Sequence, residues 1–452
     1  MKKILPLAAA FAFSAQGVYA DSNAAIATQY GSSNELSITQ TNLLESEADV
    51  TQTGNHNKST VSQANLNKGG KGMSATVVSD GDLNTANITQ DNSKLAEAEV
   101  TQTGNENTAN ITQEVKANRG DAFVTQTGND NTAGITQTNK STGHSIATID
   151  QLASYGASAT ITQDDADHST ASIQQSNYVG HSLNGAVIMQ TAGDNLLASI
   201  HQESTVDDSA FISQTGLNQT ANIHQKNYNY KGDSQVIQAG DNNNATIDQV
   251  WSGGSSTLIE QNGSSNTAAI SQYDSDDSSA TVSQNGTSLL AEISQKNAPG
   301  VGQGNGNTAT VSQADSMNTA YVDQDGFLNN TTIGQAGTGQ LSDIDQLGNG
   351  NDATIGQSGT DQYAKVLQAG GSNESDILQS GSLNWANVDQ SGEYNVADID
   401  QTGIDNDAVV IQSGVGSAAS QNMAIISQSA LMDIASITQM GGGGNSATIT
   451  QQ

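Results

Sequence analysis

Length, composition and charge exclude several classes of protein. The chain has 452 residues, of which 34% are hydrophobic and 4% aromatic, so large side chains cannot fill the cores of two or three ordinary domains. Thirteen basic and forty-six acidic residues give a formal net charge of −33, which repels nucleic acid and anionic membranes. Cysteine is absent, so neither disulfides nor thiolate metal sites can hold the fold.

The first twenty residues have the pattern of a bacterial signal peptide. Lys2 and Lys3 form a positive start, residues 4–13 are apolar, and Ala20 ends a small-residue cleavage site. The apolar segment is shorter than the ~20 residues of a membrane-spanning helix, and no later segment approaches that length. We therefore expect a mature chain of residues 21–452 that leaves the cytoplasm without membrane insertion.

From residue 23 to residue 451 one unit recurs about 36 times, at a spacing of about 11 residues. It reads Asn-x-Ala-x-Ile/Val-x-Gln, followed by four residues with glycine in the second place. Two copies read QTGNENTANITQ (102–113) and QTGNDNTAGITQ (126–137). Their shared positions are Gln102, Gly104, Asn107, Ala109, Ile111 and Gln113 in the first copy, and Gln126, Gly128, Asn131, Ala133, Ile135 and Gln137 in the second. The closing glutamine falls every 11 residues at Gln313, Gln324, Gln335, Gln346, Gln357, Gln368, Gln379, Gln390, Gln401 and Gln412.

Restricted and variable residues alternate within each unit, which indicates a β-strand with one buried face. Glycine and asparagine in the four following residues indicate a tight turn. Low hydrophobicity with high charge is also typical of disorder, but the regular repeat argues against it. We predict an all-β fold: a β-solenoid of stacked strand-turn-strand coils, cross-β and amyloid-like, with about 18 two-strand coils of 22–23 residues.

The interior of this solenoid is predicted to be thin. We expect alanine to face isoleucine or valine across it, and the glutamines and asparagines to hydrogen-bond to their copies one coil above and below. Extra residues at 66–71, 177–184 and 297–306 are predicted to lengthen turns and leave the strands unchanged. Gly441–Gly444 is interpreted as another lengthened turn.

The strand pattern begins at residue 23 and is still present at residues 445–451, without a segment typical of a solenoid cap. An uncapped end strand has free N–H and C=O groups, which favours end-to-end stacking of copies. Acidic residues oppose this association where they precede the closing glutamine and point outward. We interpret them as exposed gatekeepers against premature aggregation, or simply as a solubilising face: Asp323, Asp345, Asp389 and Asp400.

These repeats resemble those of the curlins, the subunits of bacterial curli fibres, which read approximately Ser-x5-Gln-x-Gly-x-x-Asn-x-Ala-x3-Gln. Gln52, Gly54, Asn57 and Gln63 follow this spacing, with Ser46 six residues before the first glutamine, and 102–113 and 126–137 match its second half. The resemblance covers nearly all of the mature chain, and units such as 397–403 are closer to the minor, nucleating curlin. It implies a secreted subunit that polymerises into extracellular amyloid for biofilm matrix and adhesion. It also implies itself and other curlins as partners, and a curli-type outer-membrane channel for export.

No catalytic group, cofactor motif or metal-binding spacing stands out, so we expect neither an enzyme nor a cofactor. His201 and His224 take outward strand positions and are interpreted as surface residues, and Arg119 is the only arginine. The alternative function is that of a monomeric β-solenoid that binds a surface, as an adhesin or an ice-binding protein. Outward threonines such as Thr108 and Thr112 favour it, whereas the mixture of Asn, Asp, Ser and Glu at the same positions argues against a regular array.

Overall fold

The computed structural model describes residues 23–64, 72–114, 119–138, 144–176, 183–227, 229–297 and 306–452. The chain divides into two compact units, unit 1 (Met1–His181 and Met189–Ala192) and unit 2 (Ser182–Ile188 and Gly193–Gln452). The predicted signal peptide and most residues of the three predicted turn insertions lie outside the described residues. The described ranges contain thirty-six β-strands and no helix that is long and apolar enough to span a membrane.

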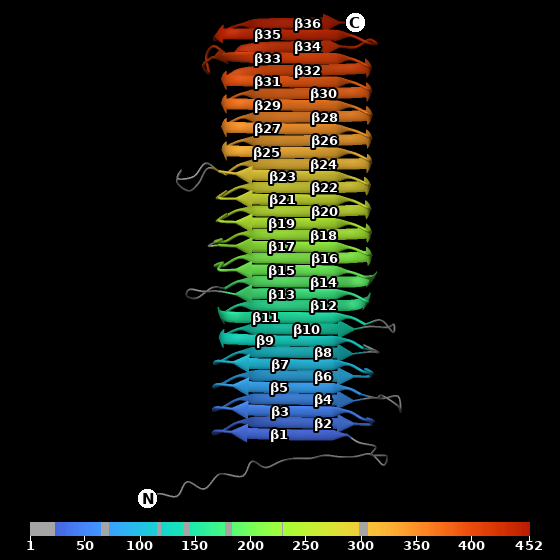
Figure 1. Cartoon of the computed structure of the whole chain (residues 1–452), viewed down its shortest axis with the longest axis vertical. Helices are drawn as coiled ribbons and strands as arrows, with labels where there is room; N and C mark the ends of the chain where they lie inside the picture. Colours follow the sequence, from blue (N-terminus) through green and yellow to red (C-terminus); the bar gives the residue numbers. More distant parts are fainter. Residues whose placement is uncertain are drawn as a thin grey trace, which may run out of the picture. The chain divides into compact units, whose positions relative to one another are not determined.

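Unit 1 consists of two parallel sheets whose strands alternate along the chain (Figure 1). Its odd sheet contains, in order of pairing, β1 (Ala24–Tyr30), β3 (Glu47–Thr53), β5 (Ser74–Asp80), β7 (Glu97–Thr103), β9 (Asp121–Asn129), β11 (Ile146–Tyr155) and β13 (Thr170–Ser176). Its even sheet contains β2 (Glu35–Thr41), β4 (Lys58–Ala64), β6 (Thr85–Asp91), β8 (Thr108–Glu114), β10 (Thr132–Thr138) and β12 (Ser158–Asp167). Each coil therefore contributes one strand to each sheet.

Unit 2 has the same arrangement, and β14 (Gly185–Asp194) contains residues of both units. The odd sheet of unit 2 contains β15 (Leu197–Glu203), β17 (Thr220–Lys226), β19 (Asn244–Val250), β21 (Thr267–Tyr273), β23 (Leu290–Lys296), β25 (Thr319–Phe327), β27 (Leu341–Asn349), β29 (Tyr363–Gly371), β31 (Trp385–Glu393), β33 (Asp407–Val415) and β35 (Ile434–Gly442). The even sheet contains β16 (Ser209–Leu217), β18 (Asp233–Asp241), β20 (Ser256–Ser264), β22 (Ser279–Thr287), β24 (Thr308–Ser316), β26 (Asn330–Thr338), β28 (Asp352–Thr360), β30 (Glu374–Ser382), β32 (Asn395–Ile404), β34 (Asn422–Gln428) and β36 (Ser446–Gln451). The predicted all-β β-solenoid with two strands per coil is confirmed.

The parallel pairing is in register, so like residues lie over like residues. In the pairing of β8 with β10, Ala109 lies beside Ala133, Ile111 beside Ile135 and Gln113 beside Gln137. Partner glutamines are 22 to 24 residues apart in most coils and 29 apart where the turn is longest. A shift of one residue would turn the apolar row outward, so the alternation of buried and exposed positions fixes this register.

The interior differs from our expectation that alanine would face isoleucine or valine. Each glutamine amide instead lies over the small residue of the opposite strand, as three of the positions with Ser or Thr in place of alanine reveal. The amide Nε2 donates to the hydroxyl in Gln52–Ser59 (2.8 Å), Gln324–Thr331 (3.0 Å) and Gln335–Ser342 (3.1 Å). The expectation was wrong because it ignored the length of the glutamine side chain, which crosses the interior and leaves room only for a small partner. The branched residues then face each other, as Val50 faces Val61.

Glycine in the turn is required by both conformation and space. Gly337 has a φ of +121°, and a Cβ atom there would collide with the carbonyl oxygen of Gly359 on the next coil. Gly334, in the same strand β26, lies in open space at an ordinary φ. The turn glycine therefore lets successive coils approach within sheet spacing, whereas the strand glycine has no such role.

Candidate functional site

The main polar feature of the interior is a set of glutamine ladders, one in each sheet. In each rung the Nε2 of one glutamine donates to the Oε1 of the glutamine one coil further along the chain, over 2.7 to 3.0 Å. The rungs of unit 1 join Gln29–Gln52, Gln102–Gln126–Gln151–Gln175 and Gln40–Gln63–Gln90–Gln113–Gln137–Gln163–Gln190. Buried amides are thereby paired along the stack, as in cross-β packing.

In unit 2 the glutamines predicted from their strict spacing all lie in these ladders. The odd sheet joins Gln324–Gln346–Gln368–Gln390–Gln412, and the even sheet joins Gln313–Gln335–Gln357–Gln379–Gln401. Each of these side chains is at most 3% exposed. The eleven-residue spacing thus places consecutive glutamines in alternate sheets.

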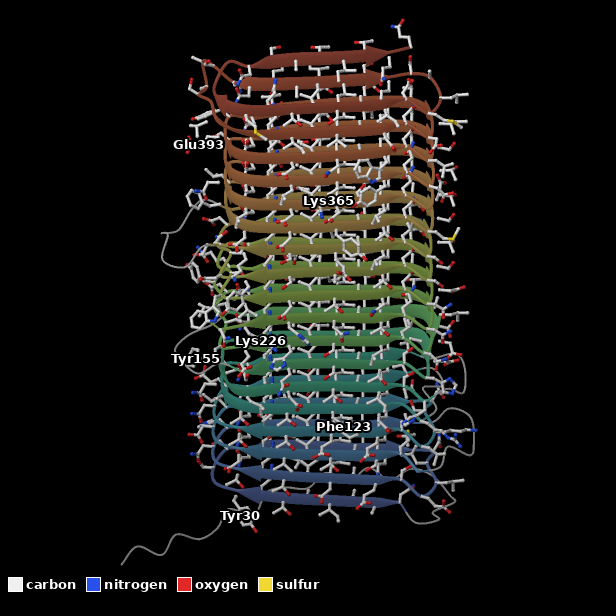
Figure 2. The ribbon with its side chains drawn as sticks, turned by 45° about the horizontal axis from the view of Figure 1, so that its top comes forward. Tyr30, Phe123, Tyr155, Lys226, Lys365 and Glu393 are labelled. Atoms are coloured by element: carbon white, nitrogen blue, oxygen red, sulfur yellow. The ribbon has the colours of Figure 1, made fainter. Side chains whose placement is uncertain are left out.

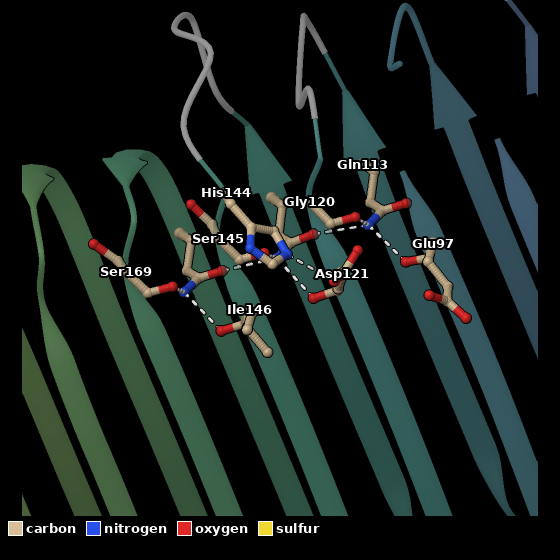
Figure 3. A network of polar contacts seen from close by, with 10 residues as sticks. Glu97, Gln113, Gly120, Asp121, His144, Ser145, Ile146 and Ser169 are labelled. Atoms are coloured by element: carbon tan, nitrogen blue, oxygen red, sulfur yellow. Dashed lines mark hydrogen bonds and ion pairs between the residues drawn. The ribbon is translucent and has the colours of Figure 1, made fainter. Parts of the chain in front are cut away.

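Most glutamines of the ladders also join the two sheets, which the sequence did not predict (Figure 3). The Nε2 of Gln113 donates to the backbone carbonyls of Glu97 (3.1 Å) and Gly120 (2.7 Å) in the odd-strand segments. Gln137 makes the equivalent bonds to Asp121 (3.2 Å) and Ser145 (3.3 Å). Because these partners are acceptors, the nitrogen of each amide must face them, which fixes the direction of the ladder.

One rung is missing from the odd ladder of unit 1. Strand β5 has Ser79 at the glutamine position, and its Oγ donates to the Oε1 of Gln102 over 3.1 Å. Gln52, on the previous odd strand, donates instead to Ser59 and to the carbonyl of Glu35. The sequence SATVVSD contained this signal, which a search for the glutamine repeat overlooked.

A second ladder of asparagines runs along the turns. The Oδ1 of Asn84 accepts the backbone N–H of Asn107 (3.0 Å), and the Oδ1 of Asn107 accepts that of Asn131 (3.1 Å). The Nδ2 of Asn107 donates to the carbonyl of Gly128 on the next coil (2.8 Å). The asparagine of the repeat therefore supplies both an acceptor and a donor to its turn.

Acidic residues line the outer face at the positions we interpreted as gatekeepers. Asp323 is exposed, whereas Asp345, Asp389 and Asp400 are half-buried between neighbouring outward side chains. Burial raises the pKa of Asp345, and the charges of Asp323 and Asp343 raise it further. The carboxylate rows of unit 2 thus repel one another, as expected for like charges at strand spacing.

One lysine interrupts the acidic rows. Lys365 projects from β29 and its Nζ lies 2.8 Å from the Oδ2 of Asp343 on β27 (Figure 2). This hydrogen bond is the main cause that raises the pKa of Lys365. The pair is partly exposed, so it offsets local repulsion more than it adds stability.

His201 and His224 lie side by side on the outer face of β15 and β17, with ring centroids 6.1 Å apart. Burial lowers the pKa of both imidazoles, and the charge of Lys226 lowers it further. The described part of the chain contains no group of three or more His, Cys, Asp or Glu side chains arranged to hold a metal ion.

The strands at the two ends of the described residues have an unpaired edge. Among these residues β1 and β2 pair only with β3 and β4, and β35 and β36 pair only with β33 and β34. The inward residues of β1, β2 and β36 are half-buried, although the same positions are buried in strands with two neighbours. Apart from Glu35, these four end strands contain no Asp, Glu, Lys or Arg.

In-register parallel coils, a thin apolar interior and directional amide ladders define a structural β-solenoid of the cross-β class. Five segments match the curlin associated repeat, at residues 104–138, 254–286, 275–314, 348–381 and 384–414. These matches support the resemblance to the curlin family that its sequence shows. No curated protein matches the chain. Curlin repeats on this fold indicate a structural protein of the curli-fibre kind.

Proposed function

We propose that this chain is a secreted subunit that assembles end to end into extracellular curli-like fibres, which serve biofilm matrix and surface adhesion. The observation that carries the proposal is the direction of the glutamine ladders. All rungs donate toward the C-terminal end, so one end of a ladder offers free acceptors and the other offers free donors. A second copy of the chain is complementary to both.

The end strands support this joint residue by residue. Gln29 and Gln40 use their Nε2 groups in the first rungs, so their Oε1 atoms face outward from β1 and β2. At the other end, Gln439 and Gln451 accept from the ladder and their Nε2 groups donate only to backbone carbonyls among the described residues. Stacking β35 on β1 and β36 on β2 would add one rung to each ladder.

Charge favours the same mode of association. The chain carries a formal net charge of −33, so the outer faces of two copies repel each other side by side. The end strands carry almost no charge, so contact between ends avoids this repulsion. We therefore expect axial growth in preference to lateral association.

The resemblance to curlins supports the finer parts of the proposal. These are export by a curli-type outer-membrane channel and other curlin subunits as partners, with this chain as either the bulk subunit or the nucleator. Incubation of residues 21–452 alone and with a major curlin separates two roles. Spontaneous fibres support a bulk subunit, whereas faster polymerisation of the other curlin supports a nucleator.

The direction of growth is tested by cysteine cross-linking, because the natural chain has no cysteine. Thr28 and Thr438 are outward residues one position before the glutamines of β1 and β35, so the proposed joint places them side by side. Oxidised fibres of the Thr28→Cys/Thr438→Cys double variant should give a ladder of covalent multimers, and each single variant only monomers. Dimers from a single variant would indicate joints between like ends. A chain that stays monomeric at high concentration, without cross-β diffraction, would refute self-assembly.

A further inference from the structure

Two rungs of the turn ladder in unit 2 are acids, Asp208 and Asp433, and of these only Asp208 is fully buried. Asp208 lies in the turn between β15 and β16, two residues before Ala210, where the repeat normally has asparagine. Its side chain is 1% exposed. Aspartate is seldom buried to this extent without a cationic partner, so the position requires an explanation.

One side of the Asp208 carboxyl reproduces the asparagine ladder. Its backbone N–H donates to the Oδ1 of Asn184 on the preceding coil over 3.1 Å. Its own Oδ1 accepts the backbone N–H of Gly232 on the following coil over 2.7 Å. Asp208 therefore accepts from the following coil as an asparagine of the ladder does.

The other side of the carboxyl does not reproduce the ladder when it is ionised. Oδ2 is buried and has no hydrogen-bond partner among the described residues. In a normal rung this place holds an Nδ2 group that donates to a carbonyl, as in Asn107–Gly128 (2.8 Å) and Asn243–Gly263 (3.2 Å). A carboxylate has no proton to donate, whereas a carboxylic acid has one.

The surroundings of the carboxyl are neutral. The side chains of Thr205 and Asn229 and the backbone of Gly232 contact it. The charged residues on the neighbouring elements are Glu203 and Asp207 before it and Lys231 and Asp233 on the following coil, and the preceding coil adds none within residues 183–188. Of these only Asp207 contributes to the pKa of Asp208, which it raises as a like charge.

We propose that Asp208 is a proton-controlled rung, which in its neutral form completes the asparagine ladder of unit 2 and in its ionised form opens the turn between β15 and β16. The neutral acid accepts through Oδ1 and donates through Oδ2–H, as asparagine does. Ionisation removes the donor and leaves a buried charge without a cation. The opening of this turn by ionisation does not depend on the proposed function. Its consequence for assembly does rest on that function: mild acid would favour the closed coil that fibre growth requires.

Burial raises the pKa of Asp208 from 3.8 to about 7, although the hydrogen bond from Gly232 and the neighbouring polar side chains of Asn229 and Thr205 act in the opposite direction. Because the pKa is higher in the folded state, the neutral group stabilises the coil fully below about pH 4. This contribution is lost progressively as the pH rises to about 7. The coil is therefore expected to open more often in neutral and alkaline solution than in mild acid.

Hydrogen exchange on the full chain tests this inference. Between pH 5 and pH 8, after correction for intrinsic rates, protection of residues 203–217 and 229–241 should fall by about tenfold to hundredfold. Asp208→Asn restores the usual rung and should remove this dependence and give higher protection at pH 8. Asp207→Asn, which removes the like charge of the exposed neighbour, should keep the pH dependence and reduce it only slightly.

Two results would overturn the proton-controlled rung: protection that does not change with pH in the natural chain, or the same pH dependence in Asp208→Asn. Exchange is measured in soluble chain and in fibres alike. A chain that never forms fibres would therefore refute the proposed function and still give a separate answer for Asp208.

Discussion

Replacing one glutamine rung by leucine tests whether the ladders stabilise the solenoid. Gln346 is fully buried, and its Nε2 donates to Gln368 (2.9 Å) and to the carbonyl of Asn330 (3.1 Å). Its Oε1 accepts from Gln324 and from Thr331, each over 2.9 Å. Gln346→Leu keeps a similar volume but leaves at least the Oε1 of Gln368 and the carbonyl of Asn330 without this donor.

Each orphaned buried group costs about 1–3 kcal/mol, so the variant should lose about 2–6 kcal/mol in its own coil. Each coil contacts only its neighbours, so the loss is local, and the thermal midpoint of the whole chain is a poor readout. Hydrogen exchange measures the loss of stability strand by strand. The amides of β25, β27 and β29 should exchange at least about 30-fold faster than in the natural chain.

The matched control is Leu347→Gln, the reverse exchange of side chains at the next residue, which is outward and 54% exposed. It should leave exchange in these three strands within about twofold of the natural chain. Equal protection in Gln346→Leu and Leu347→Gln would refute the reasoning, because the buried amides would then contribute no more than an exposed side chain.

Three further predictions concern the missing rung, the turns and the acidic rows. Ser79→Gln should complete the odd ladder of unit 1 and slow hydrogen exchange in β3, β5 and β7 by about three- to tenfold. Val78→Gln, at the adjacent outward position, should not slow it. Equal effects of the two variants would contradict a stabilising role of the glutamine ladder. Gly337→Ala should destabilise its coil by more than about 1 kcal/mol, because of its positive φ and the Gly359 carbonyl, whereas Gly334→Ala should be neutral or slightly stabilising. Hydrogen exchange of β26 and β28 in both variants compares them directly, and equal exchange would contradict the role of the turn glycine. Fibre growth, followed by thioflavin fluorescence, should accelerate when salt is added and when the pH falls from 7 toward 4. Burial raises the pKa of Asp345, Asp376 and Asp398, so these carboxylates take up protons at a higher pH than ordinary aspartates and the repulsion between them decreases. The double variant Asp345→Asn/Asp398→Asn should weaken both dependences, and growth rates that do not change with salt would exclude the repulsion.

Much of the fold could be predicted because the repeat is local and exact in its alternation. The two-residue period places Ala109, Ile111 and Gln113 on one face of the strand. Burial of that face fixes the register in which successive strands pair. The repeat likewise predicted that each glutamine bonds to its copy one coil away, as Gln346 does to Gln368. The burial of Asp345, Asp389 and Asp400 was not predicted, because half-burial of an outward residue depends on its neighbours one coil away.

The sequence by itself determined the strands, the turns, the coil length and the class of protein. Each of these depends on residue types at fixed short spacing, which the chain repeats throughout. Only the tertiary structure determined which side chains of the two sheets face each other across the interior. It placed glutamine over alanine, joined the sheets through Gln113 and Gly120, and enclosed Asp208 between neutral neighbours. These contacts join residues on opposite strands and successive coils, and their geometry depends on side-chain length and hydrogen-bond direction, which a linear pattern does not contain.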